Sequence, residues 1–203
     1  WREWNGQFRD DVRRFLRGDD NSVTAFVERL CGSPDIYHYH HADPEKSINF
    51  VTCHDGFTLW DWASYNSKHN EANGEENRDG CDHNFSWNHG HEGVTEDPQI
   101  NALRMRQAKN MMVATLLSVG SPMLLMGDEL LRTQRGNNNG YCQDNATCWM
   151  NWLPNARSQE MFRFMKELIQ YRKHLFQRPE QESMPLSLTE ILRHSEICWH
   201  GVN

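Results

Sequence analysis

The side chains best suited to chemistry stand at the ends of two short apolar runs. Residues 47–55 (SINFVTCHD) end in His54 and Asp55, and residues 123–126 (MLLM) are followed by Asp128 and Glu129. A carboxylate fixed at the end of a strand can hydrogen-bond hydroxyl groups and stabilise positive charge that develops in a transition state. An imidazole beside it adds a second hydrogen-bonding group. The pattern therefore predicts two strand ends, each carrying polar side chains.

The elements that would position these residues form one strand, loop, helix and strand unit. The two apolar runs are short and are followed by Gly56 and Gly127, as expected for buried strands that end in turns. Between them, residues 100–119 predict an amphipathic helix that stops at Gly120. Parallel strands connected in this way gather their carboxyl ends at one edge, where α/β barrels carry their chemistry. We predict an α/β fold, the C-terminal part of a (β/α)8 TIM barrel.

Helical patterns flank this unit on both sides. Residues 8–16 predict an opening helix with no strand before it in the chain, and residues 25–30 predict a second short helix. The polar stretch at residues 37–46 predicts a loop. A closing helix is expected at residues 158–176. Its buried side should consist of Met161, Phe162, Met165, Leu168, Ile169 and Phe176.

Length and the pattern after the closing helix determine the predicted domain division. A (β/α)8 barrel needs about 250 residues in its usual form, so the 203 residues of this chain are too few for a whole one. After Pro179 the pattern changes to short apolar runs typical of strands. We predict that residues 1–178 are the C-terminal part of the barrel and that residues 179–203 are a linker and the first part of a C-terminal β-domain.

Composition narrows the range of partners and cofactors. The formal net charge is −7, from 21 basic and 28 acidic residues, so nucleic acid and anionic membranes are poor partners. No run of 18 or more apolar residues occurs, and the first residues do not resemble a signal peptide. The 6 cysteines lack zinc spacing, and the alternate spacing of His38, His40 and His41 in a loop is not typical of a metal site. We therefore predict no metal, no cofactor and a cytoplasmic location, or a plastid location in a plant.

Four longer motifs carry a resemblance to a known family. In chain order they are NFVTCHDGFTL (49–59), KHNEANGEENRDG (68–80), PMLLMGDE (122–129) and GNNNGYCQDN (136–145). Together with the opening motif WNGQFRD (4–10), they resemble the glycogen debranching and isoamylase branch of the α-amylase superfamily. The resemblance extends to the closing helix and implies a glycoside hydrolase that acts on α-glucans.

The resemblance also assigns roles to the residues at the first strand end. His54 and Asp55 match the conserved pair that ends the seventh barrel strand, where the histidine hydrogen-bonds the sugar being cleaved and the aspartate stabilises the transition state. The family's nucleophilic aspartate and acid/base glutamate lie on the fourth and fifth strands, which the resemblance places before Trp1. Retaining glycosidases need that carboxylate pair, about 5 Å apart. The chain as given is therefore expected to lack the groups that break the bond, and a structural alternative for Asp55 is a turn cap.

Further candidates lie beside the second strand and in two polar loops. The candidate substrate-binding residues are Asp128, Glu129, Asn138, Asn139, Tyr141 and Asp144. Amides can bind pairs of hydroxyls, and an aromatic ring stacks on the apolar face of a sugar. The structural alternatives are support of the loop by the two acids and turn formation by the asparagine run. In the loop at about residues 66–98, a motif typical of the family indicates either sugar contact or an internally hydrogen-bonded lid; its residues are Asn70, Glu71, Asn73, Glu75 and Arg78.

Three functions remain open from the sequence. The preferred one is hydrolysis of α-1,6 branch linkages in glycogen, amylopectin or limit dextrin, with retention of anomeric configuration. The first alternative is an α-1,4-acting hydrolase or a transglycosylase of the same superfamily, which would share the His54–Asp55 strand end. The second is a truncated, non-catalytic chain that binds glucans. A nucleophile and an acid on earlier strands of the same protein would distinguish the enzymes from the binding chain.

Overall fold

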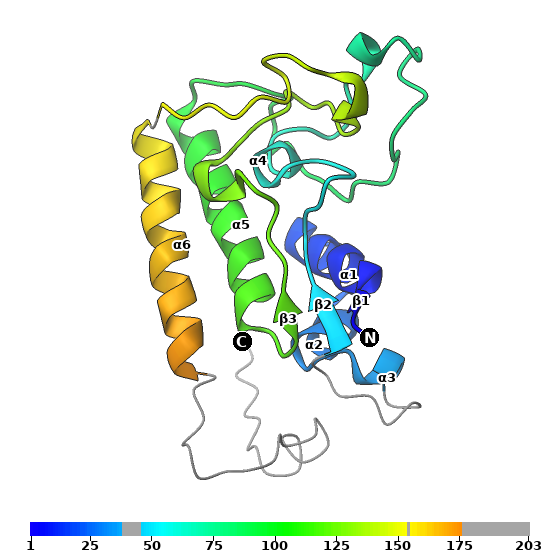
Figure 1. The fold of residues 1–203 in the computed structure, drawn as a ribbon, viewed down its shortest axis with the longest axis vertical. Coiled ribbons are helices and arrows are strands. Elements are labelled where there is room, and N and C mark those ends of the chain that lie inside the picture. The colour runs from blue at the N-terminus through cyan, green and yellow to red at the C-terminus, as the bar shows by residue number, and fades with distance from the viewer. Residues whose placement is uncertain (38–45, 154, 176–203) are drawn as a thin grey trace.

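Three short parallel strands form the sheet in the structure, a computed structural model that describes residues 1–37, 46–153 and 155–175. The strands are β1 (Glu3–Trp4), β2 (Ser47–Asn49) and β3 (Ser121–Pro122), in the order β1-β2-β3. Trp4 pairs with Ile48, and Asn49 pairs with Pro122. Because all three strands run in the same direction, their carboxyl ends lie at the same edge of the sheet (Figure 1).

Helices follow each strand, and short 3-10 turns interrupt the loops. The helices are α1 (Gly6–Arg17), α2 (Val23–Leu30), α3 (Pro34–Tyr37), α4 (Leu59–Trp62), α5 (Pro98–Leu117) and α6 (Ala156–Leu175), and the 3-10 turns are η3 (Glu71–Asn73), η4 (Asp128–Leu130) and η5 (Gly140–Cys142). Local capping explains where two of them begin. Asn5 accepts a hydrogen bond from the Phe8 amide at the start of α1, and Asp97 caps α5, whose first residue is Pro98.

The core lies between α1, α4, α5 and α6. Phe8 and Val12 of α1, Trp62 of α4 and Met161 of α6 are all fully buried around α5. Burial of such side chains contributes about 1.5–3 kcal/mol each.

Figure 1 shows α5 and α6 side by side, with residues 66–97 and 133–152 gathered beyond the carboxyl ends of the strands. We call residues 66–97 the first loop and residues 133–152 the second loop. Within the described ranges, no helix combines the length and apolarity needed to cross a membrane.

The predicted helices are confirmed, but the opening helix has a strand before it. β1 precedes α1 and pairs with β2, so the prediction that no strand came first was wrong. On the closing helix, Met161, Met165 and Leu168 are buried, whereas Phe162 is 51% exposed. Successive helical residues differ by about 100° in direction, which turns Phe162 away from α5. Phe176, the loop at residues 38–45 and the predicted β-domain at residues 179–203 lie outside the described residues.

Both predicted strands are shorter than expected: β2 ends at Asn49, six residues before Asp55, and the second strand is also more exposed. β3 ends at Pro122, and in the following run only the Met123 amide continues the ladder, by donating to the Asn49 carbonyl at 2.8 Å. Leu124 is exposed and Met126 is 72% exposed, so the prediction of a buried strand at residues 123–126 was wrong. The reason is that β3 pairs with β2 on one side, while no described strand covers its other side.

Candidate functional site

A cavity of about 260 Å³ lies where the chain beyond β2 meets both loops. We call it the site cavity. Its lining combines two guanidinium groups, one carboxylate and several amides, from Arg9, Arg13, Asp55, Gly56, Gly80, Cys81, His83, Asn84, Asn138 and Asn139. Three of these residues, Asp55, Asn138 and Asn139, were predicted from the sequence. The cavity therefore joins the predicted strand end to the predicted asparagine run.

His54 and Asp55 present their side chains to solvent at this edge of the sheet. Their side chains are 71% and 74% exposed, and His54 Nε2 lies 3.3 Å from Asp55 Oδ2. The Trp4 ring stands edge-on to the His54 ring, with 5.8 Å between the centroids. Imidazole, carboxylate and a half-exposed indole thus meet at the carboxyl ends of β1 and β2. Trp4 was not among the candidate residues predicted from the sequence, because the strand that it ends, β1, was not predicted.

Asp128 differs from the expectation of a side chain that contacts sugar, because it is buried. One carboxylate oxygen accepts the Thr52 hydroxyl, and the other accepts the Leu59 amide at 3.0 Å. Burial raises the pKa of Asp128 to about 6. Both oxygens are occupied, so Asp128 joins the segment beyond β2 to the segment beyond β3. Its neighbour Glu129 is half-buried and accepts the Gly127 amide at 2.8 Å.

Asn138 is also buried, and it joins the two loops to the strand end. It exchanges two hydrogen bonds with Asn70: the Asn70 side-chain amide donates to Asn138 Oδ1 at 2.8 Å, and the Asn138 backbone amide donates to Asn70 Oδ1 at 2.9 Å. The Asn138 side-chain amide donates to Cys81 O at 2.7 Å and to Asn84 Oδ1 at 3.0 Å. The Gly56 amide, next to Asp55, donates to the Asn138 carbonyl at 2.9 Å. Every polar group of this side chain is therefore used within the protein.

A second group of hydrogen bonds is centred on Asp79. The side-chain amides of Asn73 and Asn139 donate to Asp79 Oδ2 at 2.7 Å and 2.9 Å. The hydrogen bond from Asn73 holds the pKa of Asp79 below its usual value. With Asn70 and Asn73 used in this way, the internally hydrogen-bonded alternative fits these two residues of the first loop.

The remaining predicted residues lie on the exposed surface of the loops. The Tyr141 hydroxyl donates to Glu75 Oε1 at 3.1 Å, and the Trp149 indole donates to Asp144 Oδ1 at 2.9 Å. Tyr141 and Asp144 are exposed, and neither lines the site cavity. Glu71 and Arg78 are exposed as well. These side chains are accessible to a long ligand that extends beyond the site cavity.

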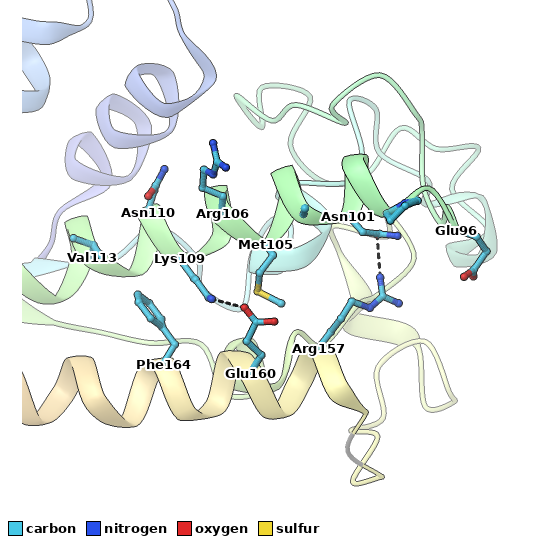
Figure 2. A pocket seen from close by; sticks show the side chains of 12 residues that line it. Glu96, Asn101, Met105, Arg106, Lys109, Asn110, Val113, Arg157, Glu160 and Phe164 are labelled. Atoms are coloured by element: carbon cyan, nitrogen blue, oxygen red, sulfur yellow. Dashed lines mark hydrogen bonds and ion pairs between the residues drawn. The ribbon is translucent and has the colours of Figure 1, made fainter. Parts of the chain in front are cut away.

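A larger cavity, of about 810 Å³, runs along α5 and α6 (Figure 2). Its walls are joined by Lys109 Nζ, which lies 2.6 Å from Glu160 Oε1, and by the Arg157 side chain, which donates to Asn101 Oδ1 at 3.0 Å. None of the predicted site residues lines it. Sites of parallel α/β folds lie at the carboxyl ends of the strands, so the site cavity is the candidate functional site. Among the described residues, no group of three or more His, Cys, Asp or Glu side chains is arranged to hold a metal ion.

The buried carboxyl of Asp128 should make stability depend on pH. Because its folded pKa is about 6 and its ordinary value is 3.8, the folded protein binds this proton more tightly between about pH 4 and 6. The corresponding stability is present below pH 4 and is lost as pH rises through 6. Asp128→Asn keeps both hydrogen bonds if the Thr52 hydroxyl turns to accept. The variant should therefore gain stability relative to wild type from pH 4 to 7, by up to about 3 kcal/mol.

Melting temperatures of the two proteins at pH 4.5 and pH 7 measure this gain. Asp61, which is buried and whose pKa is also raised to about 6 by burial, should give the same sign on substitution by Asn. Asp19, whose pKa is lowered by its hydrogen bond from Arg17, should give the opposite sign: Asp19→Asn should be less stable than wild type at both pH values, and the difference should shrink as pH falls below 4. A difference between Asp128→Asn and wild type that stays constant with pH would contradict the prediction.

The parallel strands, the helices after them and the polar loops at their carboxyl ends define a partial α/β domain whose candidate site is lined mainly by polar side chains. Comparison with known proteins identifies the family of this domain. The chain is 51% identical over 174 residues to the "Glycogen operon protein GlgX homolog" of Mycobacterium tuberculosis, which covers 86% of this chain and 24% of that protein. It is 44% identical over 202 residues to "Isoamylase SU1, chloroplastic" of Zea mays, covering 99% and 25%. The chain belongs to the glycogen debranching and isoamylase branch of the α-amylase superfamily.

Solved structures agree with this assignment. A pullulanase complexed with maltotetraose, from Anoxybacillus sp. LM18-11, matches with a TM-score of 0.65 and 25% identity over 98% of this chain and 25% of that one. No family model matches the chain. The chain spans about a quarter of the length of the curated relatives named above.

Proposed function

We propose that residues 1–178 form the C-terminal part of the (β/α)8 barrel of a glycoside hydrolase, and that residues 179–203 begin a C-terminal β-domain. Two features support the barrel: β2 and β3 are parallel neighbours, and α5 connects them. The enzyme hydrolyses α-1,6 branch linkages in glycogen, amylopectin or limit dextrin with retention. The names of the relatives support this substrate class, and the cytoplasm, or the plastid in a plant, is the corresponding compartment.

The observation that carries the proposal is the exposed His54–Asp55 pair at the carboxyl end of β2, beside the site cavity. Asp55 stabilises the oxocarbenium-like transition state, and His54 hydrogen-bonds the hydroxyls of the sugar being cleaved. The nucleophile and the acid/base come from earlier strands of the same enzyme. A single carboxylate cannot supply both of those functions, because retention requires a pair about 5 Å apart.

The burial of the other predicted residues separates those proposed to bind substrate from those proposed to position the site. Asn139, at the site cavity, Tyr141 and Asp144, exposed in the second loop, and the half-buried Glu129 of η4 are proposed to bind the α-glucan. Asp128 and Asn138 are assigned to positioning, since their polar atoms are already used by Thr52, Leu59 and Asn70 and cannot also bind hydroxyls without breaking those bonds.

The proposal is tested by the products that the complete enzyme releases from branched and linear glucans. With glycogen or amylopectin, we expect linear chains with new reducing ends, and with unbranched amylose we expect no cleavage. Proton NMR of early products should show the α-anomer first, because two displacements retain configuration. Cleavage of amylose would favour the α-1,4 alternative. Binding of glycogen without any product would favour the non-catalytic chain.

A further inference from the structure

The segment that carries His54 and Asp55 is held in an unusual way. β2 ends at Asn49, whose carbonyl accepts the Met123 amide, and the next backbone-to-backbone bond is from Gly56 to Asn138. Within the described ranges, no such bond attaches residues 50–55 to another segment. The six residues that end in the proposed transition-state stabiliser therefore depend on side chains for their position.

Two side chains from other elements supply that attachment. Arg13 of α1 donates to the Val51 carbonyl twice, through Nε at 2.9 Å and through Nη2 at 2.5 Å. Asp128 accepts the hydroxyl of the next residue, Thr52. Arg13 also donates through Nη1 to the Asn84 carbonyl in the first loop, at 3.2 Å. One guanidinium group thus joins α1, the segment beyond β2 and the first loop.

Arg13 is a buried charged side chain, and burying its guanidinium group without a carboxylate partner costs free energy. Its exposed fraction is 3%, and no carboxylate of the described residues lies within ion-pair distance of it. Burial, and secondarily the charge of Arg9, lower the pKa of Arg13 to about 10. A buried charge is costly unless it is paired or fully hydrogen-bonded, and here carbonyl oxygens alone are its described hydrogen-bond acceptors. The same side chain lines the site cavity together with Asp55.

We propose that Arg13 is a positioning residue for Asp55, which it fixes by holding the Val51 carbonyl four residues earlier in the chain. This inference rests on the proposed role of Asp55. The guanidinium group is suited to the task because its planar donors bind one carbonyl through two N–H groups while a third reaches the loop. Lysine has a single ammonium group and cannot reproduce this geometry.

Arg104 of α5 provides a matched control. It is buried like Arg13, and it too donates to backbone carbonyls of the first loop: to Gly93 O at 2.6 Å, to Asn88 O at 2.9 Å and to His91 O. It makes no described contact with residues 50–55 and does not line the site cavity. Substitution of Arg104 therefore removes a buried arginine from the same loop without releasing Asp55.

The test is a double-mutant cycle on turnover in the complete enzyme. Arg13→Ala should lower kcat about tenfold with little change in KM, because a displaced catalytic group loses rate more than binding. In an Asp55→Asn background, the same substitution should change kcat by less than about twofold. Arg104→Ala should lower the melting temperature yet leave kcat within about twofold in both backgrounds. Guanidinium ion added to Arg13→Ala should restore part of the lost turnover.

Equal loss of turnover from Arg13→Ala in both backgrounds would overturn the proposal, since Arg13 would then act independently of Asp55. If the alanine variant does not fold, Arg13→Lys replaces it in the test. The loss of kcat from Arg13→Lys should likewise vanish in the Asp55→Asn background. An equal loss of kcat in the wild-type and Asp55→Asn backgrounds would overturn the proposal. If Asp55→Asn alone leaves turnover unchanged, the role of Asp55 fails first, which separates that failure from a failure at Arg13.

Discussion

In the complete enzyme, Asp55→Asn is expected to lower kcat by about 10²- to 10³-fold, the loss typical of removing one preorganised charge-stabilising group. The substitution keeps the shape of the side chain and its ability to hydrogen-bond hydroxyls, but it removes the negative charge. KM should change little, because the charge matters most when positive charge develops on the sugar. The melting temperature should also change little, since the side chain is 74% exposed. Steady-state kinetics on amylopectin and a thermal melt measure both effects.

The control for Asp55→Asn is the same chemical change at Asp20, an exposed residue in the turn after α1. Asp20→Asn should leave kcat, KM and the melting temperature at wild-type values. Near-normal turnover of folded Asp55→Asn would remove Asp55 from the catalytic machinery. The turn-cap alternative would then apply, and it predicts a lower melting temperature with kcat unchanged.

The sequence predicted the helices well because their apolar residues recur at helical spacing. It also predicted a strand at residues 47–55, since a β-branched run followed by glycine is a local signal, but β2 ends at Asn49, six residues before Asp55. Asp128 also follows an apolar run with a glycine beside it, but its side chain is buried, whereas that of Asp55 is exposed. Its partners Leu59 and Thr52 lie 69 and 76 residues earlier, and such distant contacts decide whether a carboxylate faces solvent or the core. Position at a strand end therefore does not by itself identify a substrate-binding acid.

Arg13 and Asn138 illustrate the same limit for polar residues. In the sequence, Arg13 belongs to the polar positions of an amphipathic helix, and Asn138 belongs to a polar loop. In the structure both are buried, because the segment beyond β2 and the first loop pack over them and offer carbonyl and amide partners. Hydrophobic periodicity measures the tendency of apolar groups to be buried. It contains no information on a polar group whose burial depends on partners from another segment.

Gly80→Ala should disrupt the contact between the two loops and cost about 10² in kcat/KM. Gly80 has φ +74°, and a Cβ there would overlap Asn138 Oδ1 and stand 2.7 Å from Asn70 Nδ2. Relief of that overlap requires the Asn70–Asn138 pair to separate, which leaves buried amides without partners at about 1–3 kcal/mol each. Since the Asn138 carbonyl holds the Gly56 amide, the shift reaches Asp55. A displacement of about 1 Å at a catalytic group is enough for the expected loss.

Gly74→Ala separates this overlap from backbone strain. Gly74 lies in the same loop at φ +77°, and a Cβ there meets nothing within 4 Å. Both variants carry the cost of a left-handed alanine, about 1–2 kcal/mol, but only Gly80→Ala breaks the loop contact. Melting temperatures and kcat/KM measured in parallel should therefore show a small stability loss with near-normal activity for Gly74→Ala, and a larger loss of both for Gly80→Ala. Equal effects of the two substitutions would mean that strain alone is responsible and that the Asn70–Asn138 pair does not position the site.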